Sequence, residues 1–131
     1  MKISVKTNSR TQMIDITSQV QQAVSSSPVK NGLVHICSMH TTAAITINEN
    51  ADPSVESDIL ETINTIVPWD NNYRHMEGNS AAHIKTSLFG ASEMVPLENG
   101  RLVLGTWQGI FFCEFDGPRQ RKVNITAIPA G

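Results

Sequence analysis

Residues 108–115 read QGIFFCEF and contain the longest uninterrupted apolar run of the chain, from Ile110 to Cys113. Successive side chains of a β-strand point to opposite faces of the sheet. A run that is apolar at both alternating positions therefore indicates a strand with both faces covered. We expect this strand to extend from about Trp107 to Phe115 and to be covered either by a second sheet or by another subunit.

Further strand patterns lie on both sides of this segment. Alternating or β-branched apolar residues predict strands within residues 3–5, 13–16, 33–47, 102–104 and 122–128. The stretch 33–47 fits one extended strand or two strands with a bend near Ser38. Asp116, Gly117 and Pro118 predict a turn before the last strand.

The clearest helix pattern begins after Asp52, which is a good N-cap residue, and ends before Pro68. Pro53 fits the first turn. Apolar residues recur at helical spacing and predict one packed face. These residues are Val55, Ile59, Ile63, Ile66 and Val67.

Two shorter helices are expected on either side of it. Thr17 can cap a helix that continues to about Val24. Asn79 can cap another that ends at Gly90 and turns three apolar side chains inward. These three side chains are Ala81, Ile84 and Leu88.

Composition places the chain among ordinary globular domains. Its 131 residues, 17% charged and 40% hydrophobic, predict a single domain spanning residues 1–131. Ten Lys and Arg residues against twelve Asp and Glu residues give a net charge of −2, which argues against a general nucleic-acid binder. No apolar run approaches the roughly 20 residues that span a bilayer, so we expect no membrane partner and a cytoplasmic location.

His40 opens a segment, residues 40–49, that alternates polar and apolar side chains. As one regular strand, it would carry His40, Thr42 and Asn48 on a polar face. Glu49 would then lie on the apolar face, so a bulge or the strand end must turn its carboxylate toward the polar side. A half-solvated strand without any site explains the same pattern.

His75 and His83 lie on either side of the predicted start of the third helix. The positive end of the helix dipole favours a neutral imidazole at His83, as a metal ligand or general base requires. Together with His40 and a nearby Glu49 or Glu77, these rings would form an open three-ligand metal site. The spacing matches no established metal motif, and exposed surface histidines remain an alternative.

The last third of the chain adds polar groups beside glycines. Gln108 offers an amide between Trp107 and Gly109. Arg119 and Arg121 could bind a phosphate, or could instead pair with Glu114 or Asp116.

Three blocks of the sequence resemble the YjbQ family, whose members carry the label secondary thiamine-phosphate synthase. The blocks read HTTAAITINENADPSVESDIL, YRHMEGNSAAHIK and VPLENGRLVLGTWQGIFFCEFDGPRQR. The resemblance implies an α+β fold, a β-rich sandwich of mostly antiparallel strands with two or three short helices, which assembles as a homotrimer with pockets between subunits. It also implies one shared polar site, to which nine residues belong: His40, Thr42, Asn48, Glu49, His75, Asn79, His83, Gln108 and Arg119.

These residues lead to two functional hypotheses, beside a purely structural one in which His40 and His83 affect only the stability of the trimer. In the first, the protein is an enzyme acting on a phosphorylated small metabolite. His40, His75 and His83 would hold a divalent ion, zinc rather than magnesium because imidazole suits zinc. Glu49 and His83 would be catalytic, and Thr42, Asn48, Asn79, Gln108 and Arg119 would bind the ligand. The resemblance implies thiamine-phosphate formation, and a metal-dependent hydrolysis is equally compatible. In the second hypothesis, a noncatalytic trimer binds a metabolite or anion at the same site.

Overall fold

The computed structural model describes all residues from 1 to 131 as an α+β fold with eight strands and three helices. In chain order, the elements are β1 (Lys2–Lys6), β2 (Gln12–Asp15), α1 (Thr17–Ser25), β3 (Gly32–Ser38), β4 (Ala43–Glu49), α2 (Pro53–Ile66), α3 (Ser80–Phe89), β5 (Ser92–Glu98), β6 (Arg101–Leu102), β7 (Gln108–Glu114) and β8 (Gln120–Pro129).

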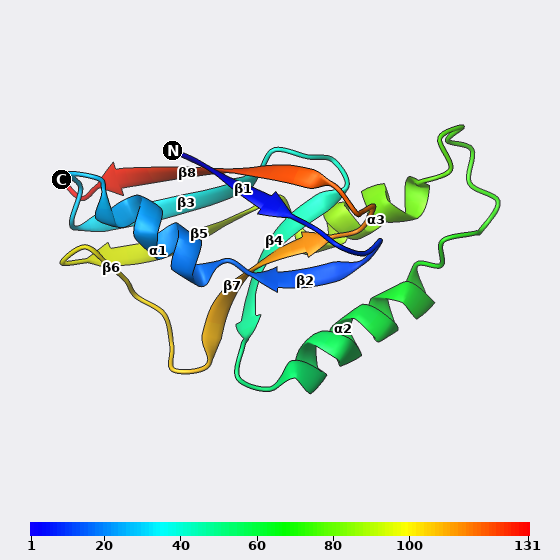
Figure 1. The fold of residues 1–131 in the computed structure, drawn as a ribbon, viewed down its shortest axis with the longest axis horizontal. Coiled ribbons are helices and arrows are strands. Elements are labelled where there is room, and N and C mark those ends of the chain that lie inside the picture. The colour runs from blue at the N-terminus through cyan, green and yellow to red at the C-terminus, as the bar shows by residue number, and fades with distance from the viewer.

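The strands form two antiparallel sheets. The larger sheet has the order β1-β8-β3-β5-β6, and the smaller one has the order β2-β7-β4. Helix α1 lies toward the end of the molecule that holds both chain termini, whereas α2 and α3 lie toward the opposite end (Figure 1). None of the three helices combines the length and the apolar character that a membrane-spanning helix needs.

Strand β7 explains the division of the core into two clusters. Its Ile110 and Phe112 join the larger cluster, which contains side chains from both sheets and from α1. Its Phe111 and Cys113 point the other way, into a cluster that α2 and α3 cover. The expectation that both faces of this strand are covered is confirmed. The second sheet covers one face, and helices of the same chain cover the other.

The stretch 33–47 forms two strands that belong to different sheets. β3 ends at Ser38 and β4 begins at Ala43. The Ser38 hydroxyl donates to the carbonyl of Ala43 at 2.7 Å and accepts from the backbone N–H of His40 at 3.2 Å, so it holds the connection between the strands. The prediction that His40 and Thr42 lie on a strand face is therefore wrong, because both precede β4.

Strand β5 lacks a counterpart among the predicted strands. Its buried Val95 and Leu97 alternate with exposed residues, but Pro96 lies between them. The carbonyl of Pro96 accepts from Val103 at 2.9 Å, on the side away from β3. Because the N and O of one residue point to the same side of an antiparallel strand, the missing N–H of proline costs β5 no bond to β3.

The helices begin within one residue of the expected positions. Thr17 is the first residue of α1 and not its cap, so that prediction is wrong by one position. The packed faces of the other two helices differ in part from the prediction. Asp52 caps α2 by accepting from the N–H of Ser54 at 2.9 Å, with Pro53 in the first turn. Ile59 and Ile63 pack as predicted, whereas Ile66 is 67% exposed.

Helix α3 departs further from its predicted packing. It buries Ala81, Ala82, Lys85 and Thr86, and it leaves Ile84 and Leu88 exposed. The prediction of an inward stripe formed by Ala81, Ile84 and Leu88 is therefore wrong for its last two members. The small side chains of Ala81 and Ala82 allow the helix to approach the sheet on this other face.

Candidate functional site

A polar pocket of about 320 Å³ lies where four segments of the chain meet. These segments are the β3–β4 connection, the loop before α3, the first turn of α3, and the β7–β8 connection with the start of β8. No hydrophobic residue lines the pocket. Its lining comprises His40, Thr41, Thr42, His75, Glu77, Asn79, His83, Arg119 and Arg121.

Six of the nine residues that the sequence assigned to one site line this pocket: His40, Thr42, His75, Asn79, His83 and Arg119. The rings of His75 and His83 meet edge to face, with their centroids 5.4 Å apart. The Nε2 atom of His75 lies 3.9 Å from a carboxylate oxygen of Glu77. The pocket therefore combines imidazole, guanidinium and amide groups in one small volume.

The other three residues, Asn48, Glu49 and Gln108, do not line it. Glu49 is the register partner of Gln108 at the far end of β4, six residues beyond Ala43. At about 3.3 Å per residue, this is roughly 20 Å from the end of β4 that adjoins the pocket. Within one chain, Glu49 is thus not placed to act as a base beside the histidines, because β4 pairs with β7 without interruption from Ala43 to Glu49.

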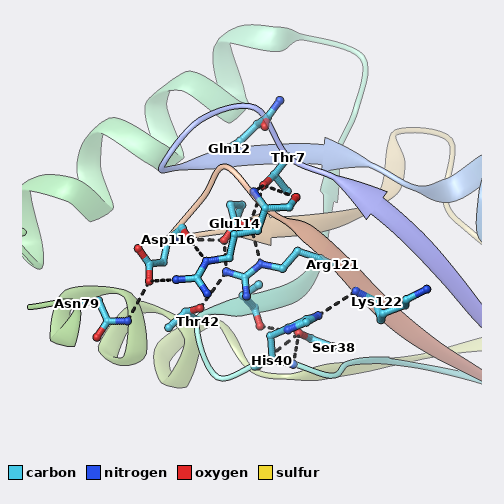
Figure 2. A network of polar contacts seen from close by, with 12 residues as sticks. Thr7, Gln12, Ser38, His40, Thr42, Asn79, Glu114, Asp116, Arg121 and Lys122 are labelled. Atoms are coloured by element: carbon cyan, nitrogen blue, oxygen red, sulfur yellow. Dashed lines mark hydrogen bonds and ion pairs between the residues drawn. The ribbon is translucent and has the colours of Figure 1, made fainter. Parts of the chain in front are cut away.

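A buried ion pair forms the wall behind the pocket. Glu114 is fully buried and Arg121 is 3% exposed. Figure 2 shows the guanidinium of Arg121 donating to both carboxylate oxygens of Glu114 and to the hydroxyl of Thr42. The Thr7 hydroxyl and the N–H of Asp116 also donate to this carboxylate, at 2.8 and 3.0 Å. Burial by itself would raise the pKa of Glu114, but these hydrogen bonds hold the pKa below its ordinary value.

A second set of contacts fixes Arg119 at the edge of the pocket. Its guanidinium donates to the side chain and to the backbone carbonyl of Asp116, both at 2.9 Å. The Asn79 amide donates to the same carboxylate at 2.9 Å (Figure 2). Asn79 precedes α3 as expected, but its side chain does not cap the helix. Its Oδ1 atom is buried and has no hydrogen-bond partner.

The hydrogen bonding of His40 determines its tautomer. Its Nε2 accepts from the backbone N–H of Lys122 at 2.9 Å (Figure 2). A neutral imidazole that accepts at Nε2 carries its proton on Nδ1 and can donate there. Burial lowers the pKa of His40, and the positive charge of Arg121 lowers it further. His40 is therefore held as a neutral ring with one free donor.

This arrangement does not fit the expected metal site. No group of three or more His, Cys, Asp or Glu side chains is positioned to hold a metal ion. His40 cannot accept from Lys122 at one nitrogen and bind a metal at the other unless it loses both protons. The donor chemistry of the pocket instead suits an anion, because Arg119 and the Nδ1–H of His40 both donate.

Sequence reasoning found most of the pocket and missed part of its support. Thr41 lines the pocket between His40 and Thr42, and Thr7 supports Glu114, but neither was assigned to the site. Thr7 has no local signal in the sequence, because it acts through a contact with a residue 107 positions away. Of the two alternatives for the arginine pair, the structure shows the ion pairs: Arg121 pairs with Glu114, and Arg119 pairs with Asp116. Phosphate binding by these arginines stays a prediction.

The comparisons with known proteins agree with one another. The family model described as "UPF0047 protein YjbQ-like" matches residues 1–130. The UPF0047 protein YugU of Bacillus subtilis is 54% identical over 124 residues, 94% of each chain. A UPF0047 protein of Methanocaldococcus jannaschii is 51% identical over 127 residues, 97% of this chain and 92% of that one.

Solved structures show the same fold. An uncharacterized YjbQ/UPF0047 protein of Clostridium acetobutylicum is 53% identical, with a TM-score of 0.95 over 98% of this chain and 99% of that one. A protein of unknown function from Sulfolobus solfataricus is 36% identical, with a TM-score of 0.94 over 99% and 96% of the two chains. On this evidence the chain belongs to the YjbQ-like UPF0047 family.

Proposed function

We propose that the polar pocket lined by His40, His75 and His83, called the histidine pocket below, is the active site of an enzyme that acts on a phosphorylated small metabolite. The observation that carries this proposal is the lining itself, which combines three imidazoles with two guanidiniums and contains no hydrophobic residue. Arg119 is half exposed, and its guanidinium is already oriented by Asp116. A guanidinium held in this way matches the geometry of a phosphate and loses little freedom when it binds.

His40 and His83 have different roles in this proposal. The Nδ1–H of His40 donates to the phosphate, because its other nitrogen is occupied by Lys122. His83, on the first turn of α3, transfers a proton to or from the reacting group, and its neighbour His75 positions the ring from a centroid distance of 5.4 Å. Glu49 has no role in this scheme.

Thiamine-phosphate formation, which the family resemblance implies, joins two phosphorylated substrates and belongs to the reactions to be tested.

Turnover assays with matched variants test the enzyme proposal. The purified protein is incubated with a panel of phosphate monoesters, and separately with the pyrimidine pyrophosphate and thiazole phosphate precursors of thiamine phosphate. His83→Asn should lower kcat by about 100-fold or more with little change in KM. Arg119→Gln should weaken substrate binding by about 10- to 100-fold. His35→Gln, in β3 and outside the pocket, is the control.

Each possible result separates the hypotheses. Turnover that is lost in His83→Asn supports the enzyme. Saturable phosphate-ester binding without turnover of any substrate contradicts it and supports a noncatalytic anion-binding protein. Binding that persists unchanged in Arg119→Gln contradicts both readings of the pocket.

We also propose that the protein assembles as a homotrimer, as the family resemblance implies. Support comes from apolar side chains that α3 and the neighbouring loop leave exposed. Leu88 is 62% and Met76 is 99% exposed, so each offers apolar surface that a neighbouring subunit could cover. Sedimentation equilibrium should give three times the mass of one chain, whereas a monomer at all concentrations would contradict the proposal.

A further inference from the structure

Lys85 is a buried cation that the histidine pocket does not use. It lies on α3, is 2% exposed, and donates from Nζ to the Asn64 side chain at 2.5 Å. No carboxylate pairs with it, and the centroid of the Phe115 ring lies 5.9 Å from Nζ. A lysine ammonium has three donors and is costly to bury without partners. The protein satisfies one of the three.

Lys85 opens onto a second cavity, of about 360 Å³. The lining has two cations and no acidic residue. It comprises Arg10, Thr11, Asn64, Pro68, Trp69 and Lys85. This volume is near the lower end of the range of ligand pockets, roughly 300 to 1,000 Å³, so it suits a small molecule.

Arg10 adds a second donor group to the same cavity. Its guanidinium carbon lies 4.1 Å from the centroid of the Trp69 ring, which supports the flat face of the guanidinium. Its N–H groups make no hydrogen bond within the chain, so the edge of the guanidinium is free. Burial lowers the pKa of Lys85, and the positive charge of Arg10 lowers it further, as expected of two cations that face a volume without a counter-ion.

Helix geometry separates this cavity from the histidine pocket. Lys85 follows His83 by two residues, and residues two apart on a helix point to nearly opposite sides. His83 lines the first pocket and Lys85 lines the second, and no residue lines both. Ligand binding at the second cavity is therefore independent of the function proposed above.

We propose that the cavity between Arg10 and Lys85 binds the oxyanion of a small molecule, a carboxylate or a phosphate, while Trp69 and Pro68 contact the apolar part of that molecule. The oxyanion accepts from the free edge of Arg10 and from the two remaining N–H groups of Lys85. It supplies the negative charge that the lining lacks. The Thr11 hydroxyl, also in the lining, is available as a further donor.

Titrations followed by nuclear magnetic resonance test this proposal on the full-length protein labelled with ¹⁵N. Benzoate and inorganic phosphate are added separately, and the signals of Lys85 Nζ, Arg10 Nε and the Trp69 indole are followed. We expect a saturable shift of all three signals with at least one probe. Benzoate alone identifies a carboxylate site, phosphate alone a phosphate site, and a response to both a general oxyanion site.

Two variants and one control make the test specific. Arg10→Gln, at an exposed residue, and Lys85→Met, which replaces the ammonium by an apolar side chain of similar length, should each weaken binding by about 10- to 100-fold. Lys6→Met removes an exposed lysine of β1 and should leave the affinity unchanged. No saturable response to either probe, or equal affinity in Arg10→Gln and the unaltered protein, would overturn the proposal.

Discussion

The buried pair of Glu114 and Arg121 makes a strong prediction about stability. Glu114→Gln keeps the shape of the side chain but removes the charge that Arg121 faces, and it places an amide N–H₂ where one carboxylate oxygen accepted hydrogen bonds. Removing one partner of a buried ion pair typically costs about 3 to 5 kcal/mol. Because Glu114 is fully buried and Arg121 is 3% exposed, solvent cannot replace the lost partner.

The expected loss is large enough to measure in two ways. For a chain of 131 residues, it corresponds to a decrease in Tm of about 10 to 18 °C. Urea denaturation followed by circular dichroism should show a lower midpoint with an unchanged m-value. The control is Glu61→Gln, which alters an exposed carboxylate of α2 and should change stability by less than about 0.5 kcal/mol.

The pH dependence gives a second, independent check on the same pair. The pKa of Glu114 is lowered in the folded protein, so its stabilising effect is complete above the unfolded pKa and is lost as the pH falls through the folded pKa. The difference in stability between the unaltered protein and Glu114→Gln should therefore shrink as the pH falls below about 4.3. A loss of less than about 1 kcal/mol at pH 7, or a difference that does not change with pH, would refute the reasoning.

Three further predictions concern the pocket and its supports. The pKa of His40 in ¹H–¹⁵N spectra should lie below the ordinary histidine value, because burial and Arg121 disfavour the charged form. The neutral ring should carry its proton on Nδ1; a proton on Nε2 would contradict the hydrogen bond from Lys122. Gly117→Ala should destabilise the protein by about 1 to 3 kcal/mol in urea denaturation, since the added Cβ would lie 2.3 Å from the carbonyl oxygen of Ser9; unchanged stability would show that this turn can open. Treatment with a chelator should leave phosphate affinity at the histidine pocket unchanged in calorimetry, whereas a loss restored by Zn²⁺ would reinstate the metal hypothesis.

The burial of both faces of β7 could be predicted, because its apolar residues occupy both alternating positions. The sequence pattern does not tell whether a subunit, a sheet or a helix packs on each face of β7, because that depends on contacts between residues far apart in the chain. Strand β5 was missed for the same reason, its dependence on long-range pairing. Val95 and Leu97 alternate with exposed residues as in a strand, but Pro96 lies between them. Proline is acceptable there because its missing N–H faces away from β3.

The site was predictable as a set of residue types more than as a geometry. His40, His75 and His83 stand out in sequence and do line one pocket. The sequence did not show that Glu49 lies away from these rings, at the end of β4 opposite the one that adjoins the pocket. Nor did it reveal the hydrogen bond from the Lys122 N–H to Nε2 of His40, which leaves Nδ1 as the donor of the neutral ring.

A titration of the full-length protein with inorganic phosphate, followed through its four imidazole rings, tests the central claim most directly. The account predicts saturable shifts of the ring signals of His40, His75 and His83, with the Nδ1–H of His40 moving most. His35, which lies in β3 outside the pocket, should not respond. If all four rings shift equally, or if none shifts at a phosphate concentration that saturates other phosphate sites, the pocket does not bind phosphate.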